Sequence, residues 1–575
     1  MTIRPPAFFD LRGYRGADLR GDAFAAAAVV VLAVPQGIAY ALIAGLPPAM
    51  GLYAAAAPAI VGALFRSSRH VITGPSNALS LLVGGAVLAG VGGADPVSTA
   101  ITLAAMVGAM QVLAGLLRLG AVVDYISSPV VTGYITGAGV LIGVGQLHNL
   151  TNTEGPRGHL LTTLVGWGST LGEAHGLSVA IGLGTVALIL GLRRVSDKVP
   201  GAFIAMVAGI LAEVVFGLGE RGVTVVSDLS PVPAGLPPLT TPSLELVAAL
   251  LPVAVAATVL SLVESSAVAR SIASRTGQRL DADTEFLGQG LANLAGAFTG
   301  GYPVSGSLAR SSLNERMGAR SRLAGALAGV GMLGVLLVAG PVVDRTPIAC
   351  LAGLLLVLAW DLVDRPRIRE ILRTRWTDGL AFAATMAGCW VLRLDKAIYL
   401  GVAISIVAFL RQARLLVVRE LAVDPTGHLR EVEVGKDAEG FERCPQIGVL
   451  HVEGSLFFGA AGELRDALTE AARAPELRVL IVRLKRTRSL DVTCATTLAE
   501  VEASMSARGQ ELLLVGMRPK SMAVLRRSGA AARIGEENLY PTLPTWFAAM
   551  KQAVDRALES LSDEERAACP LTRLS

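Results

Sequence analysis

Charged residues are scarce in this chain. Asp, Glu, Lys and Arg make up only 17% of its 575 residues, whereas a soluble domain carries about a quarter. Hydrophobic residues make up 52%, and apolar runs of about 20 residues recur along most of the chain, each long enough to cross a hydrocarbon core as a helix. The composition excludes an ordinary soluble protein and predicts an α-helical polytopic membrane protein.

The residue patterns of several other functions are also missing. The five cysteines form no CxxC pair, and three of them lie beyond the apolar part, which favours a reduced, cytosolic setting. No long basic tract with interleaved aromatics indicates a nucleic-acid partner. No nucleophile–base pair or metal-ligand spacing stands out. We therefore expect no enzyme, no cofactor, no metal and no nucleic-acid partner.

The distribution of basic residues predicts how the chain crosses the membrane. The connections after even-numbered spans carry 17 Lys and Arg residues and the odd-numbered ones carry 5. Basic residues prefer the cytoplasmic side, so we expect both termini in the cytoplasm and the protein in the cell inner (plasma) membrane. The fourteen expected spans cover residues 22–46, 48–65, 72–90, 97–117, 121–147, 176–192, 199–218, 243–268, 284–299, 303–315, 323–342, 347–361, 377–392 and 396–417.

Two of these spans open with sequence that breaks a helix. The third opens with Thr-Gly-Pro-Ser-Asn-Ala at residues 73–78, and the tenth opens with Gly-Gly-Tyr-Pro-Val-Ser-Gly-Ser at residues 300–307. Matching breaks in two halves of seven spans are typical of a transporter with an inverted repeat and a midplane site. The two helix N-termini would oppose each other and favour an anion. Kinked core helices are the alternative interpretation.

Two ionisable residues fall inside the expected spans. Glu264 lies within the eighth span and Arg310 within the tenth, two turns from its start. A carboxylate at the bilayer centre costs about 2.5–3.5 kcal/mol on insertion scales, so it needs a partner, a proton or a cation. Glu264 is therefore a candidate proton carrier, unless it simply pairs with Arg310 or Arg270 to lock two helices. Gln36, beside Pro35, either lines the cavity or caps freed backbone.

Specific motifs connect the chain to a known family. They are Val-Pro-Gln-Gly-Ile-Ala-Tyr-Ala at 34–41, Gly-Leu-Pro-Pro at 45–48 with Gly-Leu-Tyr at 51–53, Thr-Gly-Pro-Ser at 73–76 and the stretch 293–314. With them the chain resembles the SulP anion transporters, relatives of prestin and pendrin. The resemblance implies a 7+7 inverted repeat divided into core and gate domains, elevator-like alternating access and frequent homodimers. It also implies substrates such as sulfate, bicarbonate, chloride or dicarboxylates.

The resemblance also implies site residues. Glu264 matches the family's acidic position in the eighth span, and Ala309 replaces a hydroxyl residue of some relatives. Sodium-coupled bicarbonate carriers of the family have an Asp with hydroxyl ligands nearby, so we expect proton-coupled symport of a small inorganic or organic anion. Sodium-coupled bicarbonate symport and a passive exchanger or channel are the alternatives. The substrate site falls on Gln36, Tyr40, Ser76, Asn77, Ala78, Ser305, Gly306, Ser307 and Arg310.

The polar C-terminal part alternates between strand and helix patterns. Strands are expected at 446–452, 478–484 and 511–517, and helices at 460–473, 493–508 and 544–558, which predicts a small α/β domain. It resembles a STAS domain and is expected to contact regulatory partners. Asp491 and Thr493 are candidate regulatory residues, or merely cap the following helix. The expected domains are an N-terminal segment 1–20, a transport domain 21–418, a linker 419–444, the STAS domain 445–560 and a tail 561–575.

Overall fold

The computed structural model describes residues 14–90, 93–121, 127–155, 160–196, 199–338, 340–433, 440–544 and 548–573. Parts of the expected N-terminal segment, fifth span, linker, last helix and tail therefore lie outside the described residues. The chain divides into two compact units, Met1–Ile406 and Val407–Ser575. We call them the helical unit and the sheet unit and describe each by itself.

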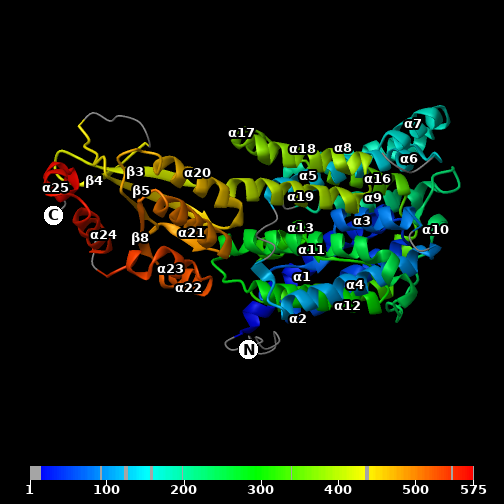
Figure 1. Ribbon diagram of the computed structural model, residues 1–575. Helices are drawn as coiled ribbons and strands as arrows, with labels where there is room; N and C mark the ends of the chain where they lie inside the picture. Colours follow the sequence, from blue (N-terminus) through cyan, green and yellow to red (C-terminus); the bar gives the residue numbers. More distant parts are fainter. Residues whose placement is uncertain are drawn as a thin grey trace. The chain divides into compact units, whose positions relative to one another are not determined.

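Each of the fourteen expected spans contains one helix of the structure, so the mostly helical membrane fold is confirmed (Figure 1). Two of these helices are short, because their spans begin with extended backbone at the predicted breaks. The fourteen helices are α1 (Gly16–Ile43), α2 (Pro48–Phe65), α3 (Asn77–Leu88), α4 (Pro96–Leu116), α5 (Ser128–Gly145), α8 (Gly176–Val195), α9 (Gly201–Phe216), α11 (Val247–Thr276), α12 (Ala282–Phe298), α13 (Leu308–Arg316), α14 (Leu323–Val338), α16 (Ile348–Asp361), α18 (Trp376–Val391) and α19 (Leu394–Ala413).

Short helices in the connections and at the end of the eleventh span were not predicted. They are α6 (Leu147–Thr151), α7 (Leu160–Thr170), α10 (Val226–Leu229), α15 (Gly340–Val343) and α17 (Arg365–Thr374). Three of them have only four or five residues, too few for a periodic pattern, whereas α17 is strongly amphipathic and offered a usable signal. Figure 1 places α17 and the start of α1 at the same, left-hand end of the helical unit.

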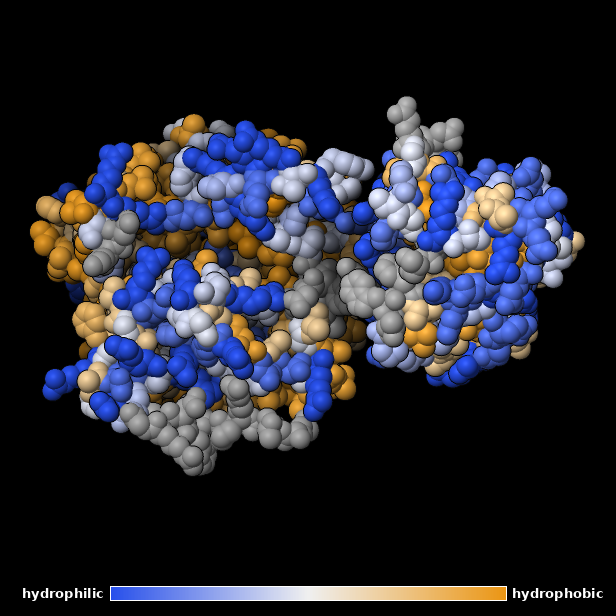
Figure 2. All heavy atoms as spheres, turned by 90° about the vertical axis from the view of Figure 1, so that its left-hand side faces the viewer, coloured by the Kyte–Doolittle hydropathy of each residue, from blue (hydrophilic) through white to orange (hydrophobic). Residues whose placement is uncertain are grey.

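The surface of the helical unit suits a bilayer. Six helical stretches in the described part of the chain are long and apolar enough to cross a membrane. In Figure 2, hydrophilic side chains gather over the end of this unit that faces the viewer, and hydrophobic ones show at its edges. The six stretches are Gly16–Ile43, Pro48–Phe65, Pro96–Leu116, Ser128–Thr151, Gly176–Val195 and Leu244–Thr276.

The sheet unit is built on a seven-stranded sheet in the order β4-β3-β5-β6-β8-β9, with β7 paired to β5. Strands β5, β6, β8 and β9 are parallel, and β3 and β4 extend the sheet antiparallel. The strands are β3 (Val417–Val423), β4 (Leu429–Val432), β5 (Ile447–Leu456), β6 (Val479–Arg483), β7 (Thr487–Leu490), β8 (Glu511–Met517) and β9 (Leu539–Pro541), with helices α20 (Ala461–Ala471), α21 (Val492–Ser506), α22 (Pro519–Arg527), α23 (Ala530–Ile534), α24 (Ala548–Glu559) and α25 (Asp563–Ala568).

Two expected boundaries of this unit need correction. The segment 419–444, expected as a linker, contributes β3 and β4 to the sheet, and Val423 and Val432 are buried. The segment 561–575, expected as a tail, contains α25, and its Cys569 and Leu571 are buried in the core beneath α24. Both segments are polar overall, so the few buried residues that fix them are not apparent from composition.

Candidate functional site

The two predicted breaks lie side by side. Strand β1 (Thr73–Gly74) pairs antiparallel with β2 (Ser305–Gly306), with Thr73 opposite Gly306 and Gly74 opposite Ser305. Because α3 follows β1 and α13 follows β2, this pairing brings the starts of both helices to one place. At a rise of 1.5 Å per residue, 12 and 9 residues make helices only about 18 and 14 Å long, too short to cross a bilayer alone. The interpretation as continuous kinked helices is thereby excluded.

Each of the two helices begins with a serine cap. Ser76 Oγ accepts from the backbone N–H of Leu79, and Ser307 Oγ accepts from that of Arg310, both at 3.4 Å. The caps leave other first-turn N–H groups, such as those of Leu308 and Ala309, without a helix carbonyl to bind. At these helix starts Leu308 and Ala309 are exposed and Asn77 is half-buried.

Glu264 is fixed at the first break. Ser76 Oγ lies 2.9 Å from its Oε2, so the cap of α3 also donates to this carboxylate of α11. The next residue of α11, Ser265, lies against the second break, where a Cβ added to Gly306 would come within 3.1 Å of its Oγ. Helix α11 therefore contacts both breaks. A coupling role of Glu264 would require its carboxylate to lie close to the substrate site.

Arg310 links the second half-helix to the first break. Its guanidinium is 1% exposed and donates from Nη2 to the carbonyl oxygen of Pro75 at 2.6 Å. A side chain on Gly74 would collide with it, since a Cβ there would lie 2.8 Å from Nη1. Its Nε has no hydrogen-bond partner among the described residues. Arg310 belongs to the first turn of α13, not the second as expected, because the helix starts only at Leu308.

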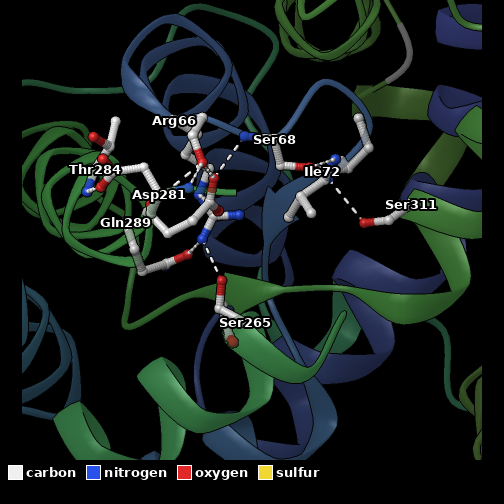
Figure 3. A network of polar contacts seen from close by, with 12 residues as sticks. Arg66, Ser68, Ile72, Ser265, Asp281, Thr284, Gln289 and Ser311 are labelled. Atoms are coloured by element: carbon white, nitrogen blue, oxygen red, sulfur yellow. Dashed lines mark hydrogen bonds and ion pairs between the residues drawn. The ribbon is translucent and has the colours of Figure 1, made fainter. Parts of the chain in front are cut away.

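A buried polar network supports the second break (Figure 3). Arg66, fully buried at the end of α2, donates from Nη2 to Ser265 Oγ and to Gln289 Oε1. Gln289 Nε2 in turn donates to the carbonyl oxygen of Val304, at 2.8 Å, directly before β2. The charge of Arg66 is balanced by Glu285, whose Oε2 lies 3.8 Å from Nε. Helices α2, α11 and α12 are thus tied to the backbone that positions Ser305.

Comparison with known proteins identifies the family of this chain. The model of the sulfate permease family matches residues 19–385, and that of the STAS domain matches residues 438–545. The chain belongs to the sulfate permease family. Members of this family are anion transporters and not enzymes, which confirms the expectation that no catalytic centre is needed. The sheet unit of this permease is its STAS domain.

Curated relatives align with the permease over nearly its full length. A probable sulfate transporter of Mycobacterium tuberculosis is 29% identical over 556 residues, covering 95% of this chain and 98% of the relative. The putative sulfate transporter YvdB of Bacillus subtilis is 28% identical over 537 residues, covering 92% and 97%. Human solute carrier family 26 member 6 is 28% identical over 483 residues, covering 79% and 62%.

Solved structures share the fold. Murine solute carrier 26 family member A9, in an inward-facing state, superposes with a TM-score of 0.86 at 18% identity and covers 96% of this chain and 94% of its own. The transmembrane domain of the cyanobacterial bicarbonate transporter BicA gives a TM-score of 0.59 at 23% identity and covers 67% and 98%. These likenesses confirm the helical membrane fold with a C-terminal STAS domain.

The two predicted site residues of α1 lie deep in the permease. Gln36 is 3% exposed and Tyr40 is 6% exposed. Helix α1 packs against both α3 and α13, so these side chains come from a helix that contacts both half-helices. Gln36 Oε1 has no hydrogen-bond partner in the described part of the chain. If the side-chain amide of Gln36 is flipped, its NH2 group takes the place of Oε1 and can donate a hydrogen bond to an anion.

Sequence reasoning missed Arg66 and Glu285. The position of Arg66 directly after the second span suggests a basic residue of a loop, but its side chain is buried. Glu285 was not predicted as a functional residue, although it falls inside an expected span, where a carboxylate needs a partner. That need was a usable signal, but the partner lies 219 residues earlier in the sequence, so its identity was not apparent.

The structure also places the two candidate regulatory residues of the STAS domain. Asp491 caps α21, accepting from the N–H of Cys494 at 2.9 Å and from that of Phe458 at 2.6 Å. Thr493 is exposed in the first turn of the same helix. For Asp491 the capping interpretation therefore has direct support, and a regulatory role of either residue stays a prediction.

Proposed function

We propose that this permease is a proton-coupled symporter of a small anion, of the sulfate, bicarbonate or dicarboxylate class. The observation that carries the proposal is the pairing of β1 with β2, which brings two helix N-termini, Arg310 and Glu264 to one place. Each helix N-terminus contributes roughly half a positive charge, and the guanidinium adds a full one. Such a site attracts an anion. The proposed binding residues are those of the substrate site predicted from the sequence: Gln36, Tyr40, Ser76, Asn77, Ala78, Ser305, Gly306, Ser307 and Arg310.

Glu264 is the proposed proton carrier. Its carboxylate binds Ser76, the cap of one anion-binding helix, so protonation changes the charge beside the anion. A proton on Glu264 removes a negative charge and strengthens anion binding, which couples the two solutes. Sodium coupling is the second candidate, since carboxylate and hydroxyl oxygens also bind Na⁺. The buried Arg310 nearby opposes a proton and Na⁺ on this carboxylate alike, so separately imposed proton and sodium gradients are needed to decide between them.

We further propose that the protein lies in the plasma membrane with both termini in the cytoplasm. The start of α1 and α17 lie at one end of the helical unit (Figure 1), and the connection that contains α17 carries five arginines. Basic connections favour the cytoplasmic side. Elevator-like movement of a core against a gate, and a homodimer, are proposed from the family alone.

Uptake into proteoliposomes tests the proposal. Radiolabelled sulfate, bicarbonate and a dicarboxylate are offered separately, with a proton gradient or a sodium gradient imposed. We expect accumulation driven by the proton gradient in the wild type and its loss in Glu264→Gln, with anion exchange at equal pH retained. Accumulation driven only by sodium would favour the second candidate, and uptake unchanged in Glu264→Gln would refute proton coupling through this residue.

A further inference from the structure

Helix α17 has features that neither the transport site nor the STAS domain explains. It connects α16 to α18, two helices of the membrane fold, and carries four arginines and one glutamate in ten residues. Ile371 is buried against the helical unit and Arg367 Nη2 donates to Ser128 Oγ of α5 at 3.0 Å. The helix is thus attached along one face and turns its other face outward.

Three acidic groups near α17 are already engaged. Asp361 forms an ion pair with Arg193, Asp364 caps the helix through the N–H of Arg367, and Glu370 pairs with Arg367. Arg369 and Arg373 remain. They are exposed, lie one helical turn apart on the same face, and have no ion-pair partner among the described residues. Two adjacent positive charges are therefore available to an anionic partner.

Exposed apolar side chains flank these arginines. Leu372 is 56% exposed and Trp376, at the start of α18, is 68% exposed. Trp360, at the end of α16, is 64% exposed, with the guanidinium of Arg365 4.0 Å from its ring centroid. Tryptophan is enriched where membrane spans meet the headgroup region, and a helix with arginines beside apolar side chains is typical of the membrane surface.

We propose that α17 lies in the membrane interface and binds the phosphates of anionic phospholipid headgroups through Arg369 and Arg373. Leu372 and Trp376 would contact the upper acyl chains of the same lipids, which a free phosphate does not offer. Clusters of basic residues directly beside a membrane span attract anionic lipids in this way. The proposal does not depend on which anion or coupling ion the permease uses.

Titration with a soluble, short-chain phosphatidylglycerol tests this proposal on the full chain in phosphatidylcholine nanodiscs. An environment-sensitive fluorophore on Thr374→Cys, an exposed position of α17, reports binding, and all five native cysteines are buried. Short-chain phosphatidylcholine and glycerol phosphate serve as parallel ligands. We expect saturable binding of phosphatidylglycerol, little of the other two, and weakening at high salt, where screening is stronger.

Substitutions locate the effect. Arg369→Gln with Arg373→Gln should weaken binding about tenfold or more, since each basic residue near a charged surface contributes to attraction. Arg369→Lys with Arg373→Lys keeps both charges and should retain binding. Arg316→Gln with Arg320→Gln removes two exposed charges, one at the end of α13 and one just beyond it, and should change little.

Several results would overturn the proposal. They are no response to phosphatidylglycerol, an unchanged affinity in the glutamine variant, or an equal loss in the control at Arg316 and Arg320. Equal binding of glycerol phosphate would assign the site to a free phosphate instead. Loss of binding in the lysine variant too would leave the lipid site in place, and it would show that the phosphate needs the guanidinium geometry and not the charge alone.

Discussion

The two half-helices start alike but differ along their length. Helix α3 is apolar, and Leu79, Leu82 and Val83 pack into the main core. Helix α13 is polar: Ser311 Oγ accepts from the N–H of Ile72 at 2.9 Å, and Asn314 Nδ2 donates to the carbonyl oxygen of His70 at 3.1 Å. The polar side chains of the second repeat therefore hold the backbone of the first break.

The two repeats therefore contribute different features to the site. The first supplies a helix N-terminus embedded in apolar packing, and the second supplies the fixed positive charge and most of the polar support. Only Ser80 of α3 makes a comparable cross-contact in the described residues, with its Oγ 3.1 Å from Tyr302 Oη. Within the two half-helices, substitutions in α13 should consequently have larger effects than substitutions in α3.

The largest effect is expected for Arg66→Met, which removes the cation that supports the second break. Glu285 would be left buried without its counter-charge, and breaking a buried ion pair in this way costs about 3–5 kcal/mol. Thermal unfolding in detergent measures the loss. The double variant Arg66→Met with Glu285→Leu removes both charges and should recover most of the stability. Arg69→Met, at an exposed neighbour, should stay near wild type; an equal loss there would contradict the role of the network.

Arg310→Gln should have the next largest effect, on anion uptake. A hydrogen bond to a charged group contributes about 1.5–3 kcal/mol, so the apparent affinity for the anion should fall by about 10- to 150-fold. Arg310→Lys should retain part of it, because the charge remains although the contact with Pro75 is lost. Arg316→Gln, an exposed arginine at the end of the same helix, is the control. Uptake kinetics that are unchanged in Arg310→Gln would place the anion elsewhere.

Ser76→Ala and Ser307→Ala compare the two caps directly. Each substitution removes an N-cap, which costs about 0.5–2 kcal/mol, so we expect similar losses of thermal stability. Only Ser76 also donates to Glu264. The pH profile of uptake should therefore move in Ser76→Ala and stay in place in Ser307→Ala. Equal profiles in the two variants would separate Glu264 from the coupling step.

Much of this architecture was predictable from local sequence. Apolar runs indicate all fourteen helices, and Gly and Pro at 73–78 and 300–307 indicate both breaks, because each signal lies within one segment. Some helix ends differ more widely, since α11 continues to Thr276 although its expected span ends at 268. Pairing of the breaks followed from the inverted arrangement of the halves. The repeat therefore indicates which distant segments lie together, which no single segment shows by itself.

What could not be predicted depends on contacts between distant residues. The charge of Arg66 looked like a loop charge because nothing nearby in the sequence shows that Glu285 and Gln289 enclose it. Strands β3 and β4 resemble a linker in sequence because they lie at one end of the sheet, where only a few of their side chains are buried. Arg310 was placed one turn too deep because the extended residues Ser305 and Gly306 delay the start of α13.

The smallest effect is expected in the STAS domain, at Thr493 beside the cap of α21. Asp491→Ala removes a carboxylate that accepts two backbone N–H groups and should destabilise α21 by about 1–2 kcal/mol. Thr493→Ala changes an exposed side chain and should cost less than about 0.5 kcal/mol. Hydrogen exchange of the α21 amides in the full chain measures both. A cost at Thr493 as large as that at Asp491 would show that Thr493 also stabilises α21 and is more than a surface residue.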